Sequence, residues 1–132
     1  MQSPALRRTF TSDDGLELVA DWTGPVDGPV VLLAHGGGRT RRSWKGTLPA
    51  LAAQGWEAAA LDLRGHGDSQ WSPVPDYTLP AYAADLRAAA ESIACGREIH
   101  LVGASLGGLS SLLASTTLPG LRSLVLVDVV PE

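Results

Sequence analysis

Residues 99–108 indicate the fold most directly; their sequence is Ile99-His100-Leu101-Val102-Gly103-Ala104-Ser105-Leu106-Gly107-Gly108. It begins with a short apolar run typical of a buried strand, and a helical pattern follows it to about residue 116. The sequence G-x-S-x-G stands between them. In a strand-to-helix turn, this pattern predicts a serine in a strained backbone conformation whose hydroxyl projects from the end of a sheet. Glycine is expected on both sides of Ser105, because a Cβ there would collide with the adjoining strand or helix.

Strands and helices alternate on both sides of this turn. We expect strands over residues 8–11, 16–22, 30–34, 56–63, 99–102 and 121–127, and helices over 43–54, 82–94 and 106–116. Pro49 fits only in a first helical turn, so the regular part of the first helix is expected to begin nearer Thr47. After an antiparallel hairpin, the strict alternation predicts an α/β fold, with a mostly parallel sheet and helices on both faces.

The composition limits both the size and the partners of the protein. The 132 residues are 45% apolar, which supplies about 59 core side chains, enough for one domain but not two. A net charge of -4 gives no electrostatic footprint for nucleic acid or for an anionic membrane surface. Neither of these is therefore an expected partner.

Two further features bear on location. We see no secretory signal at the N-terminus, and no apolar run approaches the roughly 20 residues that a membrane span needs. Cys95, the single cysteine, cannot form an internal disulfide. This usage fits a reducing compartment, so the cytoplasm is the expected location.

The turn around Ser105 also predicts where a negative charge would be stabilised. A serine at a helix start aims backbone N–H groups at a bound carbonyl oxygen, and the amide of Leu106 is the first expected donor. A second donor is expected from the glycine-rich turn after residues 30–34. Gly37 is the predicted donor, with Gly38 beside it in the predicted binding site.

Three motifs each follow a predicted strand. In chain order they are His35-Gly36-Gly37, the turn of residues 64–69 (RGHGDS), and Gly103-x-Ser105-x-Gly107. In this order they resemble the N-terminal half of the α/β-hydrolase superfamily, in the branch of serine esterases, lactonases, C–C hydrolases and haloperoxidase-like enzymes. Dehalogenases and most epoxide hydrolases of the superfamily carry Asp at the serine position. The resemblance implies hydrolysis of an ester, thioester, lactone or C–C bond of a small-molecule substrate through an acyl-enzyme. It implies no metal and no organic cofactor.

The resemblance also implies that catalytic groups are missing. In this family the acid usually follows the seventh strand and the histidine the eighth, whereas the predicted strands stop at the sixth. We therefore expect residues 1–132 to be the N-terminal part of a single α/β-hydrolase domain, with the fold truncated after the sixth strand and very low activity by itself. Structural roles are expected for His35, His66 and His100. Asp128 follows the sixth strand and is a possible acid; the alternative is a turn residue at the strand end.

Several polar and aromatic residues near these motifs have two interpretations each. Trp44 and Trp71 either line an acyl pocket or pack in the interior, and Trp44 is retained as a substrate-binding candidate. The basic run of residues 39–45 either meets an anionic substrate or is a solvated loop. Asp62 is expected to anchor the turn of residues 64–69.

The last predicted strand, residues 121–127, would form an unpaired apolar edge. We therefore expect this edge to pair with a C-terminal half on a partner chain, with a second copy, or with further parts of a longer protein. The principal hypothesis is an incomplete serine hydrolase. The alternatives are a catalytically inactive binding module and a truncated gene product.

Overall fold

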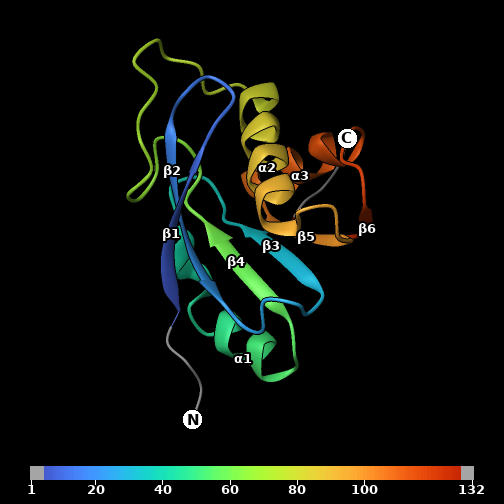
Figure 1. Ribbon diagram of the computed structural model, residues 1–132. Helices are drawn as coiled ribbons and strands as arrows, with labels where there is room; N and C mark the ends of the chain where they lie inside the picture. The colour runs from blue at the N-terminus through green and yellow to red at the C-terminus, as the bar shows by residue number, and fades with distance from the viewer. Residues whose placement is uncertain (1–4, 129–132) are drawn as a thin grey trace.

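The computed structural model describes residues 5–128, which form a six-stranded sheet with helices on both faces (Figure 1). The strand order is β1-β2-β4-β3-β5-β6. Pairing is antiparallel between β1 and β2 and between β2 and β4, and parallel across β4, β3, β5 and β6. This confirms the predicted α/β class. The strands are β1 (Leu6–Thr11), β2 (Glu17–Thr23), β3 (Val30–Ala34), β4 (Glu57–Leu61), β5 (Ile99–Ala104) and β6 (Leu121–Val127).

The helices divide between the two faces of the sheet. The elements are η1, a 3-10 turn (Arg41–Trp44), α1 (Thr47–Ala53), α2 (Leu79–Ala94) and α3 (Leu106–Ser115). Apolar side chains of α2 and α3 share one buried cluster with one face of the strands, and those of α1 share a smaller cluster with the other face. All five residues of β3 and all five of β4 are buried, as expected for strands covered on both sides.

Local sequence features determine the first residues of α1 and α2. Regular helix begins at Thr47, as Pro49 predicted, and residues 41–44 form a separate 3-10 turn. The expected start of α2 at residue 82 was wrong. The Thr78 side chain accepts a hydrogen bond from the Ala81 N–H, and Pro80 occupies the first turn, so this helix begins at Leu79.

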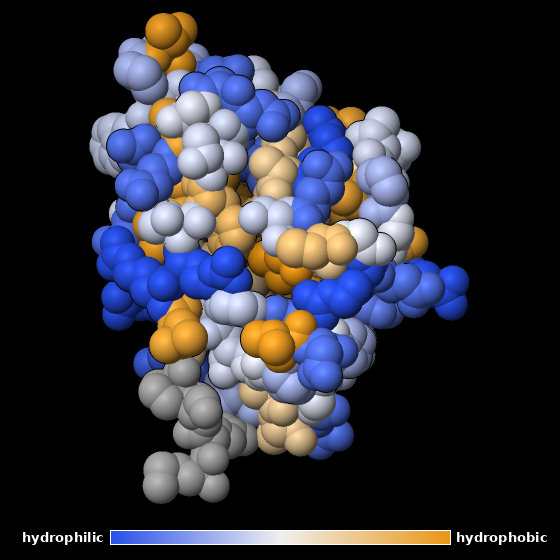
Figure 2. Space-filling view, in the orientation of Figure 1, coloured by the Kyte–Doolittle hydropathy of each residue, from blue (hydrophilic) through white to orange (hydrophobic). Residues whose placement is uncertain are grey.

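The edge strand β6 pairs only with β5 within residues 5–128. Val125 is 50% exposed and Val127 is 40% exposed, so apolar side chains remain in contact with solvent at this edge. On the face drawn in Figure 2, hydrophilic residues surround scattered apolar patches. Among the described residues, no helix is long and apolar enough to cross a membrane.

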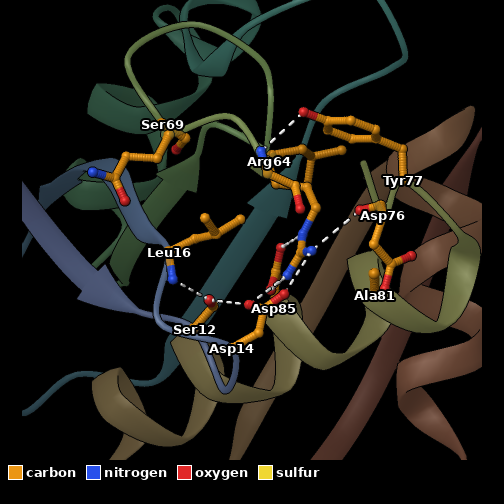
Figure 3. A network of polar contacts seen from close by, with 12 residues as sticks. Ser12, Asp14, Leu16, Arg64, Ser69, Asp76, Tyr77, Ala81 and Asp85 are labelled. Carbon is orange, nitrogen blue, oxygen red and sulfur yellow. Dashed lines mark hydrogen bonds and ion pairs between the residues drawn. The ribbon is translucent and has the colours of Figure 1, made fainter. Parts of the chain in front are cut away.

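A buried arginine links three distant segments (Figure 3). The Arg64 side chain is 2% exposed, and its Nε and Nη2 atoms each lie 2.7 Å from an Asp85 carboxylate oxygen on α2. Two further hydrogen bonds of 2.9 Å reach Asp14 in the β1–β2 turn, and one of 3.2 Å reaches the carbonyl of Asp76. The guanidinium group therefore joins the hairpin, the loop after β4 and the helix α2.

We predict that Arg64→Leu lowers the free energy of unfolding by about 3 to 5 kcal/mol, because it leaves the Asp85 carboxylate buried and unpaired. Chemical denaturation measures the loss. Arg122→Gln is the control, since Arg122 forms an exposed pair with Glu98 and should change stability by less than about 1 kcal/mol. The double variant Arg64→Leu/Asp85→Leu should recover part of the loss; equal stability of Arg64→Leu and the parent would contradict the assignment.

Candidate active site

Ser105 occupies the turn between β5 and α3, at the carboxyl edge of the parallel strands. Its backbone has φ 50° and ψ -115°, an uncommon conformation for a residue with a side chain. The Ser105 N–H donates to the Val127 carbonyl (3.0 Å), and the Ser105 carbonyl accepts from the Leu109 N–H (2.9 Å). The strained backbone predicted from the sequence is therefore present, and the residue is exposed to solvent.

The two flanking glycines are required by close backbone contacts. A Cβ on Gly107 would lie 2.5 Å from the carbonyl oxygen of His35, and one on Gly103 would lie 2.7 Å from the Cα of Gly108. The Gly107 N–H also donates to the His35 carbonyl (3.1 Å). The steric reason expected for glycine at both positions is confirmed, and the first turn of α3 lies directly against the end of β3.

The backbone amides of Gly37 and Leu106, beside Ser105, have no hydrogen-bond acceptor within residues 5–128, and neither does the amide of Gly36. The Gly37 Cα lies against the Leu106 side chain, since a Cβ built on it would be 3.8 Å from Leu106 Cβ. The Gly38 N–H differs, because it donates to Nε2 of His66 (3.2 Å). The structure thus leaves the amides of Gly37 and Leu106 available to a ligand, whereas that of Gly38 is engaged.

A cavity of about 490 Å³ opens in front of Ser105. The structure brings Gly37, Trp44 and Asp128 together with Ser105 in its wall, and Arg39 and Ser43 from the same loop as Trp44 also line it. Trp71 is 75% exposed, so the expectation of buried packing was wrong, and it is not among the residues that line this cavity. Among the described residues, no cluster of three or more His, Cys, Asp or Glu side chains is arranged to hold a metal.

None of the three histidines forms a hydrogen bond with Ser105 within residues 5–128; each has other polar partners. His35 is fully buried; its Nε2 accepts from the Leu63 N–H (3.0 Å), so its Nδ1 carries the proton and donates to the Gly36 carbonyl (2.7 Å). His66 accepts from Gly38 through Nε2 and donates to the Arg64 carbonyl through Nδ1 (3.0 Å). His100 contacts the Ser123 hydroxyl at 2.5 Å and packs edge-on against Trp56.

His35 and His66 connect the loops after β3 and β4 in both directions. His35, in the loop after β3, accepts a hydrogen bond from the Leu63 N–H in the loop after β4. His66, in the loop after β4, accepts one from the Gly38 N–H in the loop after β3. The two rings lie 5.0 Å apart between centroids. Burial lowers the pKa of His35 below its ordinary value of 6.5, although the hydrogen bond to the Gly36 carbonyl opposes this effect. The neutral form of His35 is therefore part of the folded site.

Arg41 anchors the loop that carries Arg39, Ser43 and Trp44. It is 3% exposed and pairs with Asp21 (2.9 Å), Asp62 (2.5 Å) and Asp68 (2.8 Å). The solvated-loop interpretation is therefore wrong for this residue. Asp62 also accepts from the Asp68 N–H (2.9 Å), which confirms that it anchors the turn of residues 64–69.

The position of Ser105 on a strand-to-helix turn, at the carboxyl edge of a mostly parallel sheet, defines a class of α/β proteins whose sites are built at that edge. A family model described as the alpha/beta hydrolase fold matches residues 29–131. The chain belongs to this family.

Individual relatives agree with this assignment. The chain is 37% identical to an esterase of Mycobacterium tuberculosis, over 84% of this chain and 36% of that protein. It is 31% identical to a non-heme chloroperoxidase of Streptomyces lividans, over 93% and 45% respectively. Among solved structures, an epoxide hydrolase of Vigna radiata superposes with a TM-score of 0.88 at 27% identity, covering 98% of this chain and 41% of that one. The chain thus spans less than half the length of these proteins.

We predict that Gly107→Ala lowers the free energy of unfolding by about 2 kcal/mol or more, because its Cβ would overlap the carbonyl groups of Ala34 and His35. Gly46→Ala is the matched control, since its Cβ would meet no atom within 4 Å and its φ of -86° suits any residue. Thermal or chemical unfolding measures both variants. Equal stability of the two variants would show that the contact between α3 and β3 is loose.

The His35 contacts predict a pH dependence of stability. Because the folded pKa is lowered, the unfolded chain binds a proton more readily, so this contribution to stability is present above pH 6.5 and declines as the pH falls below it. Denaturation of the parent protein and of His35→Asn between pH 7.5 and 5 measures the effect. The parent should lose more stability over this range than His35→Asn; parallel pH profiles would contradict the prediction.

Proposed function

We propose that this chain carries the nucleophile and the oxyanion-binding groups of a serine hydrolase. The Ser105 hydroxyl oxygen attacks the carbonyl carbon of an ester, thioester, lactone or C–C substrate, the leaving group departs, and water releases the acyl group from the serine. The supporting observation is the pair of free amides, on Gly37 and Leu106, beside a serine with φ 50°. Two N–H groups that donate to one oxygen stabilise negative charge on a carbonyl, and we assign that role to Gly37 and Leu106.

The nucleophile sits at the N-terminus of α3, whose ten residues add a favourable dipole at the reacting carbonyl. Serine at position 105 supports acyl transfer. The similar solved structures include epoxide hydrolases. Most epoxide hydrolases of the superfamily carry Asp at the position of the nucleophile, whereas this chain has Ser105 there. The curated relatives include esterases, which supports the same assignment.

The general base of this reaction comes from outside residues 5–128. The ring nitrogens of His35 and His66 are both engaged with the backbone, and His100 contacts Ser123. A histidine and an acid supplied by further sequence or by a partner chain would complete the site. Asp128 is the candidate acid within the described residues, since it lines the cavity and directly follows Val127, whose carbonyl binds the Ser105 N–H.

The exposed edge of β6 supports pairing with another strand. Val125 and Val127 remain accessible there, and an accessible apolar edge strand favours strand addition. We assign this edge to a C-terminal half of the domain or to a second copy of the chain. Cys95, the single cysteine, is exposed and free, which supports a reducing, cytoplasmic location.

The proposal predicts covalent labelling at one serine. A fluorophosphonate should react with Ser105 in the protein as expressed from its own gene, because Ser105 lines the cavity beside the free amides of Gly37 and Leu106. Mass spectrometry of peptides locates the label. Ser105→Ala should abolish labelling, and Ser43→Ala, which changes a serine lining the same cavity, should retain it.

The same experiment separates the proposal from an inactive binding module. Such a module keeps the cavity but leaves Ser105 unreactive toward the fluorophosphonate. Labelling that persists in Ser105→Ala, or that occurs at Ser43, would place the reactive group elsewhere and overturn the proposal.

A further inference from the structure

We propose that Arg39 is a specificity-determining residue that binds an anionic group of the substrate. The inferred substrate class has a carboxylate a few bonds from the reacting carbonyl. This inference rests on the proposed serine hydrolase function and names the chemistry of the molecule that enters the cavity. It requires that Arg39 lie beside Ser105, that its charge be free, and that the cavity distinguish an anionic end from a neutral one.

Arg39 lies close to Ser105 across Gly36. Its N–H donates to the Gly36 carbonyl (3.1 Å), which closes a tight turn after β3. A Cβ built on Gly36 would lie 3.4 Å from Ser105 Cβ and 3.8 Å from Arg39 Cγ. The Cβ atom of Ser105 and the Cγ atom of Arg39 therefore lie no farther apart than the sum of these two distances. Both residues line the same cavity. A guanidinium there reaches a group a few bonds from a carbonyl bound at Ser105.

The charge of Arg39 is not neutralised by a carboxylate in the part of the chain that the structure describes. Its neighbour Arg41 contacts three aspartates, whereas Arg39 is exposed and forms no ion pair within residues 5–128. A guanidinium offers a planar pair of N–H donors that matches the two oxygens of a carboxylate. Arg39 can therefore accept a ligand anion without first breaking an existing ion pair.

The cavity lining carries a positive charge at Arg39 and a negative charge at Asp128. Residues 39–45 contain four cations. Asp21, Asp62 and Asp68 offset the charge of Arg41, so Arg39, Arg42 and Lys45 carry the unpaired positive charge of this loop within residues 5–128. Asp128 lines the same cavity, and its carboxylate forms no ion pair with Arg39. A substrate anion is attracted to the loop of residues 39–45 and repelled by Asp128, which fixes the direction in which it enters.

The loop is also held in place before a ligand binds. Arg41, two residues after Arg39, is buried, and both its backbone N–H and its guanidinium bind Asp62 at the end of β4. An anchored loop loses less conformational freedom when it binds a ligand. The buried arginine thus positions the loop, and the exposed arginine is free to contact the substrate.

Two fluorophosphonate probes with the same alkyl chain, one ending in a methyl group and one in a carboxylate, test the inference. In each reaction the Ser105 oxygen bonds to phosphorus, the P–F bond breaks, fluoride leaves, and the hydroxyl proton passes to solvent. In the protein as expressed from its own gene, the carboxylate probe should label Ser105 about fivefold faster, the size expected of a solvated charge pair. Added salt should reduce this preference.

Arg39→Gln should bring the ratio of the two labelling rates to about one, whereas Arg122→Gln, at the opposite end of the parallel strands, should keep the parent ratio. Labelling of Ser105 at equal rates in the parent protein, or a preference that survives Arg39→Gln, would overturn the role of Arg39 and leave the proposed function intact. Labelling by neither probe would overturn the proposed function, and this inference would fall with it.

Discussion

The close contact between the first turn of α3 and the end of β3 is the constraint on which the site depends. Gly107 donates to the His35 carbonyl, and no side chain fits between its Cα and the backbone of Ala34 and His35. The chain must therefore leave β5 and enter α3 within one residue, which places Ser105 at φ 50°. Strain of this kind costs about 1 to 3 kcal/mol, and the hydrogen bonds of Ser105 to Val127 and Leu109 help to hold it.

Polar side chains, rather than apolar packing, hold the loops around that turn. His35 and His66 exchange backbone hydrogen bonds between the loops after β3 and β4, and Arg41 draws the next segment onto Asp62. Arg64 extends the connections to α2 and to the β1–β2 hairpin. His35, Arg41 and Arg64 are buried, and removing one partner of their contacts leaves the other without its hydrogen bonds, so the loops adopt one arrangement before a ligand arrives.

The sequence contained most of the fold because apolar runs and glycines mark strands and turns directly. The strand of residues 121–127 and the helix start at Thr47 were predicted correctly. The start of α2 was missed because Pro80 is equally compatible with a loop and with a first helical turn, and only the hydrogen bond from Ala81 to Thr78 distinguishes them. Arg41 was misjudged because its three aspartates are 20 or more residues away along the chain, so no local pattern shows the pairing.

The backbone amides and the side chains of the site depend on different features of the sequence. The free amides of Gly37 and Leu106 follow from backbone geometry, so any chain with these turns would present them whatever side chains surround the cavity. The chain is similar in sequence to a chloroperoxidase as well as to an esterase, and it shares its fold with an epoxide hydrolase. In our proposal, the chemistry depends instead on the side chain at position 105, and substrate choice depends on the charges that line the cavity. Those charges can vary without disturbing the contact between Gly107 and β3.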